Sequence, residues 1–161
     1  MALIPQVEII KLTTHLDERG YFREILKASQ FPKFGQWSMS YMHHEVIKAF
    51  HCHRIQYDYW FCASGVIKAV VCDLRPVIFS LEFPDLSKCQ WGEANGCQEF
   101  ILGDNQEPKV LVIPPGIAHG LKVLQGPAVL MYITTEEYNP NDEGRIPFDA
   151  LGYDWFATKI T

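Results

Sequence analysis

Short apolar segments separated by turn-forming residues run through most of the chain. The segments are rich in Val, Ile, Phe, Tyr and Trp, which favour β-strands, and they are bounded by Gly, Pro, Asn or Asp. Many short strands at regular spacing are typical of a sandwich or a closed barrel. We predict strands over residues 7–12, 20–25, 37–42, 57–62, 66–74, 77–83, 99–102, 109–113, 120–124 and 128–133.

Turn and helix signals complete this all-β pattern. Ala63–Gly65 and Gln125–Pro127 have the composition of hairpin turns. Helical signals are few, and we expect one turn within residues 28–34 and another after Pro140.

Composition and charge narrow the class of protein. The 161 residues are 48% hydrophobic and 13% aromatic, which predicts one folded domain over residues 1–161 and excludes disorder. The net charge of -5 gives no support for a general nucleic-acid surface. Because no apolar stretch could span a bilayer and no leader precedes the first strand, we expect a cytoplasmic protein with no membrane partner.

The five cysteines, at positions 52, 62, 72, 89 and 97, contain no Cys-x-x-Cys pair, which excludes a zinc ribbon or a thioredoxin-type motif. Their number is odd and no secretion signal is visible, so we predict reduced thiols. Cys52 is expected to pack in the core.

Two segments carry the candidate chemistry. In the first, alternation along a strand places His51 and His53 on one face, and Asp58 follows closely. In the second, a proline-glycine turn at Pro114–Gly116 re-enters the barrel and delivers His119 to its interior. Histidines that share a face with a carboxylate nearby predict a pocket.

Taken together, these segments resemble the two signature motifs of the cupin superfamily, with Asp58 where a glutamate is usual. The resemblance implies a cupin double-stranded β-helix, a jelly-roll-like barrel with little helix. His51, His53, Asp58 and His119 then form a plausible site for a metal ion, or a different proton-transfer set.

A narrower family fits from about Asp17 to Trp155, and the chain resembles the dTDP-4-dehydrorhamnose 3,5-epimerase family. Its opening motif and its segment before the catalytic histidine both have counterparts here, as do its proline-glycine stretch and its tyrosine-bearing segment. The matching stretches are Asp17–Glu24, Gln36–Ser40 with Val46–His51, Val112–Leu121, and Met131–Thr135 with Tyr138–Pro140 and Glu143.

The epimerase resemblance implies a homodimer that binds a nucleotide-linked 4-keto-6-deoxy sugar. It implies His51 as the general base and Tyr132 as the general acid. It assigns nucleotide contacts, partly across the dimer, to the opening motif. The substrate-binding residues that it implies are Arg19, Phe22, Glu24, Gln36, Lys48, His119 and Tyr138, with Lys48 in place of the family's arginine.

The chemistry is coherent without the family. A proton on the carbon next to a ketone is acidic because its removal gives an enolate. Histidine suits the removal of such a proton near neutral pH, and a tyrosine on the opposite sugar face can return one. The proton transfers need no metal, but a positive group must stabilise the enolate oxygen.

Several family residues are replaced here. The expected asparagine is Ser38, the enolate-steadying lysine falls near Asp58, and an aspartate is replaced by Ala69. His53 stands where glutamine is usual. The late Ser-x-x-Asp-type segment, whose aspartate pairs with the catalytic histidine, has no counterpart before Thr161.

We therefore predict an epimerase or isomerase of a nucleotide-linked keto sugar. Arg54 and Lys68 are candidates for the missing positive charge, although a solvated position fits each equally well. Since an ion on His51 would occupy the lone pair that a base needs, we predict no cofactor and no stoichiometric metal. The alternatives are a single-site epimerase or ketoisomerase, a metal-dependent cupin such as a dioxygenase or metal-assisted isomerase, and a non-catalytic sugar- or nucleotide-binding cupin.

Overall fold

The computed structural model describes residues 4–80, 82–83, 86 and 96–157, and it is almost entirely β-structure. Its helical content in these ranges is two short 3-10 turns, Ala28–Gln30 and Ile78–Ser80. Within the same ranges no helix is long and apolar enough to cross a membrane. The strands are β1 (Glu8–Lys11), β2 (His15–Asp17), β3 (Gly20–Phe22), β4 (Gln36–Met42), β5 (Ile47–Cys52), β6 (Asp58–Asp73), β7 (Gln98–Gly103), β8 (Lys109–Ile113), β9 (Ile117–Thr134) and β10 (Gly144–Arg145).

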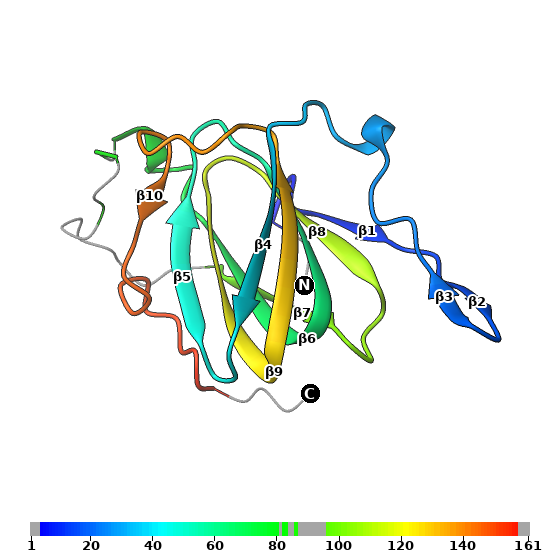
Figure 1. Ribbon diagram of the computed structural model, residues 1–161. Helices are drawn as coiled ribbons and strands as arrows, with labels where there is room; N and C mark the ends of the chain where they lie inside the picture. Colours follow the sequence, from blue (N-terminus) through cyan, green and yellow to red (C-terminus); the bar gives the residue numbers. More distant parts are fainter. Residues whose placement is uncertain (1–3, 81, 84–85, 87–95, 158–161) are drawn as a thin grey trace.

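Two long strands, β6 and β9, pair along their whole length and hold the sheet together. One end of this pair carries β8 and β1 beside β6, and β4 beside β9. The other end carries β7 beside β6, and β5 with β10 beside β9. All these pairs are antiparallel, so the described strands form two halves that share a bent central pair (Figure 1).

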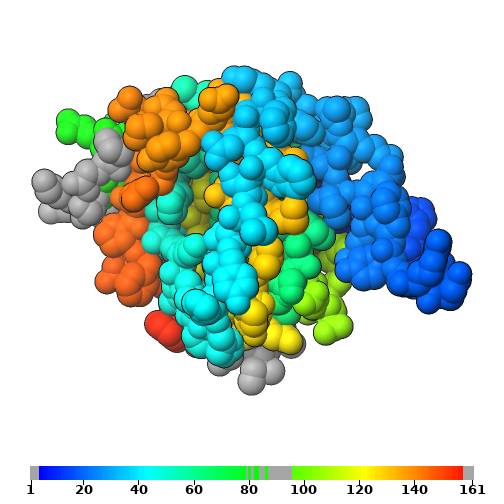
Figure 2. Space-filling model, in the orientation of Figure 1, coloured from blue at the N-terminus to red at the C-terminus, as the bar shows by residue number. Residues whose placement is uncertain are grey.

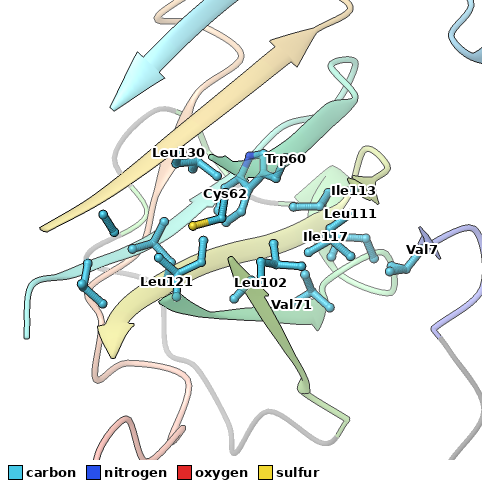
Figure 3. Packing of buried hydrophobic residues seen from close by; sticks show 14 of the residues in the cluster. Val7, Trp60, Cys62, Val71, Leu102, Leu111, Ile113, Ile117, Leu121 and Leu130 are labelled. Carbon is cyan, nitrogen blue, oxygen red and sulfur yellow. The ribbon is translucent and has the colours of Figure 1, made fainter. Parts of the chain in front are cut away.

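The main hydrophobic cluster contains residues from both halves, which places the two halves face to face. Trp60 and Leu130 come from one half, and Val71, Leu102 and Leu121 from the other. Figure 3 shows these side chains pointing toward one another between the strands. This apolar packing holds the two halves of the barrel together, and the polar residues line the cavity beside it.

Alternation along β6 and β9 decides which side chains face inward. Near the start of β6, Trp60 packs in the central cluster, while Tyr59 packs in a separate cluster on the outer face. Further along, Ala69 and Val71 point inward and Val70 points outward. The same period of two places alternate residues of β9 at the interior.

Both predicted hairpin turns are wrong, because each lies within a continuous strand. The register between β6 and β9 shifts at Cys62, Ser64 and Val66, so this segment is an irregularity in β6 and not a reversal. Likewise, β9 continues through Gln125–Pro127. Bulges of this kind bend a strand without ending it, and local composition does not separate a bend from a turn.

Other boundaries also differ from the predictions. The predicted strand at 77–83 is wrong where it can be compared, because Ile78–Ser80 is a 3-10 turn; residue 81 lies outside the described residues. The predicted strand from Gly20 ends early, at Phe22, and pairs with β2 in a separate hairpin. The helical turn within 28–34 is confirmed. The turn expected after Pro140 is not helical over residues 141–157, the part of the tail that the structure describes, and this part contains β10.

The prediction that all cysteines are reduced is wrong for Cys72 and Cys97, which form a disulfide. The β6–β7 register explains their proximity. Val71 lies opposite Gln98 in this antiparallel pair, and Cys72 comes directly after Val71 while Cys97 comes directly before Gln98. Cys52 is buried in the core, as predicted, and Cys62 is a buried free cysteine. Cys89 lies outside the described residues.

Candidate active site

A cavity of about 350 Å³ opens between the edges of β4 and β5, a volume suited to a small-molecule ligand. Its floor contains Trp60 and two leucines, and its walls are polar. Six of the nine predicted site residues line it: His51, Tyr132, Gln36, Lys48, His119 and Tyr138. The other lining residues are Ser40, His53, Gln56, Asp58, Trp60, Leu121, Leu130, Thr134, Asn139 and Glu143.

A register shift in β5 brings two of these residues to the same face. Lys48 pairs with Leu121, and His51 pairs with His119, with an irregularity between them. In a regular strand, residues three apart point to opposite faces. The irregularity turns both Lys48 and His51 toward the cavity, while Phe50 and Cys52 pack in the core behind.

Glu143 pairs with His51, and the sequence predicts no catalytic or binding role for it. The Nδ1 of His51 lies 3.0 Å from Oε1 of Glu143. The short strand β10 makes this contact, since Arg145 lies opposite His51 and Ile146 exchanges two backbone hydrogen bonds with Phe50. Because β10 has only two residues, the alternating pattern that reveals strands is missing there.

The surroundings of His51 lower its pKa to about 4. Withdrawal of the ring from bulk water is the main cause, the neighbouring His119 and His53 add to it, and Glu143 opposes it. His51 is therefore neutral near pH 7. With Nδ1–H donated to Glu143, the lone pair on Nε2 is available, and the side chain still exposes 42% of its surface.

A second histidine–carboxylate pair lies deeper in the cavity. The Nε2 of His119 is 3.0 Å from Oδ2 of Asp58, and both side chains are almost fully buried. Gln56 donates to Oδ1 of Asp58 at 2.7 Å and lies 3.2 Å from Nε2 of His53. These four residues form one hydrogen-bonded group from β6, β9 and the β5–β6 connection.

Burial opposes ionisation of Asp58, but the hydrogen bond and charge of His119 outweigh it and lower the pKa of the carboxyl. Burial lowers the pKa of His53, with a further contribution from His119. Asp58 is thus an anion and His53 a neutral ring at neutral pH. Such an arrangement can hold a cation or a proton.

The opposite wall holds Tyr132 and the residues around it. Tyr132, on β9, lies across from Trp60 on β6 and from Ser38 on β4. Gln36 donates to the Ser38 hydroxyl at 2.7 Å and accepts from the backbone N–H of Tyr138 at 3.1 Å. These bonds fix the rim residues in place around the cavity mouth.

The opening-motif residues lie elsewhere. Arg19, Phe22 and Glu24 do not line the cavity, and the side chains of Arg19 and Phe22 are largely exposed. Arg19 binds Asp17 within its own hairpin, at 2.5 Å. Figures 1 and 2 show the β2–β3 hairpin projecting from the side of the barrel.

Neither candidate for the missing positive charge reaches the cavity. Lys68 shares the outward parity of Val70, and its Nζ bonds the carbonyl of Trp155 at 3.2 Å. The guanidinium of Arg54 lies over the ring of Phe83, 4.2 Å from its centre. Lys48 is the lysine among the lining residues, and it donates to the Ser40 hydroxyl at 2.7 Å.

Comparison with known proteins now identifies the family. The family model for dTDP-4-dehydrorhamnose 3,5-epimerase matches residues 2–161. The spore coat polysaccharide biosynthesis protein SpsL of Bacillus subtilis (strain 168) is 38% identical over 160 residues, which cover 95% of this chain and 97% of that protein. The dTDP-4-dehydrorhamnose 3,5-epimerase of Salmonella typhimurium (strain LT2) is 30% identical, with 98% of this chain and 85% of that protein covered.

A solved structure supports the fold. The dTDP sugar isomerase from Desulfovibrio desulfuricans G20 superimposes with a TM-score of 0.78 at 21% identity, covering 96% of this chain and 95% of that one. The predicted all-β cupin fold is thereby confirmed. With a family match along almost the whole sequence and the same fold in a solved relative, this chain belongs to the dTDP-4-dehydrorhamnose 3,5-epimerase family.

Proposed function

We propose that this protein epimerises or isomerises a nucleotide-linked 4-keto-6-deoxy sugar by moving a proton on a carbon next to the keto group. The observation that carries the proposal is the His51–Glu143 pair at the cavity wall. It presents a neutral imidazole, held by one nitrogen, to a space large enough for a sugar ring. A histidine so placed is suited to general-base catalysis.

The base step follows from the orientation of His51. Its Nε2 takes the proton from the carbon, the C–H electron pair becomes the C=C bond, and the carbonyl π pair moves to oxygen. The imidazolium that forms is stabilised by Glu143, which accepts from Nδ1. Glu143 thus supplies the partner that the family takes from its later aspartate.

Return of a proton from the other side of the sugar plane inverts the carbon. Tyr132 comes from β9, in the half of the barrel that carries β4, whereas His51 comes from β5 in the other half. A sugar held between them has the two groups on different sides. If the proton returns instead to the former keto carbon, and the hydroxyl proton of the deprotonated carbon passes to the former keto oxygen, the keto group migrates.

The nucleotide is assigned to the rim and to a second subunit. Lys48 at the mouth provides a cation for the diphosphate. The hairpin bearing Arg19 and Phe22 projects from the side of the barrel (Figure 2) and does not line its own cavity, so in our proposal it reaches the cavity of a partner copy. Trp37, Met39 and Tyr41, exposed on the outer face of β4, offer an apolar surface for such a dimer.

Deuterium exchange tests the proposed reaction. Wild-type protein is incubated with dTDP-4-keto-6-deoxyglucose in heavy water, and deuterium at each carbon is followed by NMR. We expect incorporation next to the keto group, and the labelled position identifies the carbon that reacts. Tight binding of the nucleotide sugar with no wash-in at any carbon would favour the non-catalytic alternative.

A further inference from the structure

Three side chains in the cavity converge on one point from different parts of the chain. A nitrogen of His53, a nitrogen of His119 and a carboxylate oxygen of Asp58 all lie within 4.8 Å of one another. All three residues are at least nine-tenths buried. Two imidazoles and a carboxylate are a common ligand set for divalent transition metals.

The hydrogen bonds of the two histidines leave the correct nitrogens for a metal. In His53, Nδ1 faces the carbonyl oxygen of Asp142 at 2.9 Å, and in His119, Nδ1 faces the carbonyl oxygen of Ile117 at 3.0 Å. Because a carbonyl oxygen only accepts, each Nδ1 is the donor, and each Nε2 is the nitrogen that faces the cavity. Metal-binding histidines are typically oriented by such second bonds.

Hydrogen-bond contacts among these side chains now take up the ligand atoms that would bind a cation. Nε2 of His119 faces Oδ2 of Asp58 at 3.0 Å. The amide nitrogen of Gln56 donates to Asp58 and approaches Nε2 of His53. A metal ion would bind Nε2 of His119 and the carboxylate of Asp58 in place of their mutual contact, and the Gln56 side chain would turn aside.

His51 does not belong to this group. Among the described residues, the converging set contains only His53, Asp58 and His119. Nδ1 of His51 is bound to Glu143, and its ring centre lies 6.5 Å from that of His119. The conflict foreseen from the sequence, in which one histidine cannot be both ligand and base, disappears when the ion uses the other three residues.

We propose that His53, Asp58 and His119 bind one divalent transition-metal ion, with Zn²⁺ as the reference case, beside a metal-free His51. Three protein ligands leave the ion open positions. Its chemical role rests on the proposed function: the ion would supply the positive charge that polarises a keto oxygen, where the family has a lysine and this chain has Asp58. Its binding does not rest on that function, and it is measured without substrate.

The test uses untagged, full-length protein treated with EDTA and then dialysed free of chelator. Calorimetric titration with ZnCl₂ should give one equivalent per chain. Titration with Co²⁺ should produce visible absorption bands that Zn²⁺ then removes. His53→Gln and Asp58→Asn should each weaken Zn²⁺ binding by more than the roughly 10- to 100-fold expected for losing a second-shell partner.

Two variants make the result specific. His51→Asn should bind one equivalent of Zn²⁺ as tightly as wild type, because His51 is not a ligand. His44→Ala, in the exposed β4–β5 connection, controls for surface histidines and should also leave binding unchanged. Circular dichroism confirms that each variant is folded, and His53→Gln carries the test if Asp58→Asn is not.

Three outcomes overturn the proposal. The first is uptake of less than half an equivalent of Zn²⁺ or Co²⁺ by folded wild-type protein at micromolar concentrations. The second is binding by folded His53→Gln as tight as that of wild type. Loss of binding in His51→Asn would show a site that includes the base. If Zn²⁺ binds as proposed and no proton exchange occurs, the metal site stands and the proposed function fails.

Discussion

Two histidine–carboxylate pairs in one cavity have the same length and opposite surroundings. His51 and Glu143 are 3.0 Å apart near the surface, and His119 and Asp58 are 3.0 Å apart in the interior. The side chain of His51 is 42% exposed, whereas that of His119 is 4% exposed. Contact distance alone therefore does not reveal what either pair does.

The difference in burial leads us to expect different roles for the two pairs. The outer pair keeps one imidazole nitrogen open to a ligand, so in the proposed reaction its carboxylate orients the base. Both nitrogens of His119 have partners, so the inner pair has no free lone pair for a substrate proton. In a buried pair, removal of one member leaves the other charge without compensation. The outer pair should thus control rate, and the inner pair stability and charge.

Replacement of the outer histidine gives the largest expected effect. His51→Asn should lower the rate of deuterium exchange by about 10²- to 10⁴-fold, the usual contribution of a general base. The midpoint of urea unfolding should stay close to wild type, because the side chain is partly exposed. The measurements are NMR exchange and urea denaturation. Wild-type exchange in this variant would remove His51 from the mechanism.

Replacement of the inner histidine should instead lower stability. His119→Leu should lower the free energy of unfolding by about 3–5 kcal/mol, because Asp58 is left as an uncompensated buried charge. Urea denaturation of chelator-treated protein measures the loss. The double variant Asp58→Leu/His119→Leu should recover part of it, since no charge remains unpaired. Equal losses in the single and double variants would contradict this account.

Much of the fold could be predicted from local pattern. Strand composition located β1, β4, β7 and β8 almost to the residue, because each is short and bounded by turn formers. Local composition predicts turns at the bends in β6 and β9, since a bulge and a reversal use the same small or polar residues. The Cys72–Cys97 bond depends on the β6–β7 register, which composition does not report.

Site residues that lie in contiguous sequence motifs could be predicted, and those brought in from elsewhere in the chain could not. His51, His53, Asp58 and His119 share the cavity as expected, because two contiguous segments carry them. Glu143 was missed as the partner of His51, since a two-residue strand far along the chain makes that contact. Lys68 was misplaced because its strand parity becomes clear only when β6 is known to be continuous.

Glu143, the carboxylate of the outer pair, offers a further test of the difference between the two pairs. Glu143→Gln should lower kcat about ten- to a hundredfold, equivalent to the 1.5–3 kcal/mol typical of a hydrogen bond to a charged group. KM should change little, because Glu143 acts through His51 and not on the sugar. Steady-state kinetics separates the two constants. Glu137→Gln, an exposed neighbour, is the matched control and should behave as wild type.

Glu143→Asp adds a readout that a purely structural role does not predict. The aspartate keeps the charge and shortens the reach, so it should recover part of kcat that Gln does not. Unfolding free energy should change by no more than about 1 kcal/mol in either variant, as for partly exposed ion pairs. A fall in stability that matches the fall in kcat would assign Glu143 to the fold.

The smallest effect is expected at the cavity mouth, where charge meets solvent. Lys48 is exposed and donates to Ser40 across the gap between β4 and β5. Lys48→Ala should weaken dTDP binding about two- to tenfold, equivalent to the 0.5–1.5 kcal/mol of one typical hydrogen bond. The loss should shrink as salt rises, because exposed charges are screened. Calorimetry at low and high NaCl concentration measures it, with Lys11→Ala on β1 as the control. A loss that is independent of salt would mean that Lys48 supports the cavity wall instead of meeting the diphosphate.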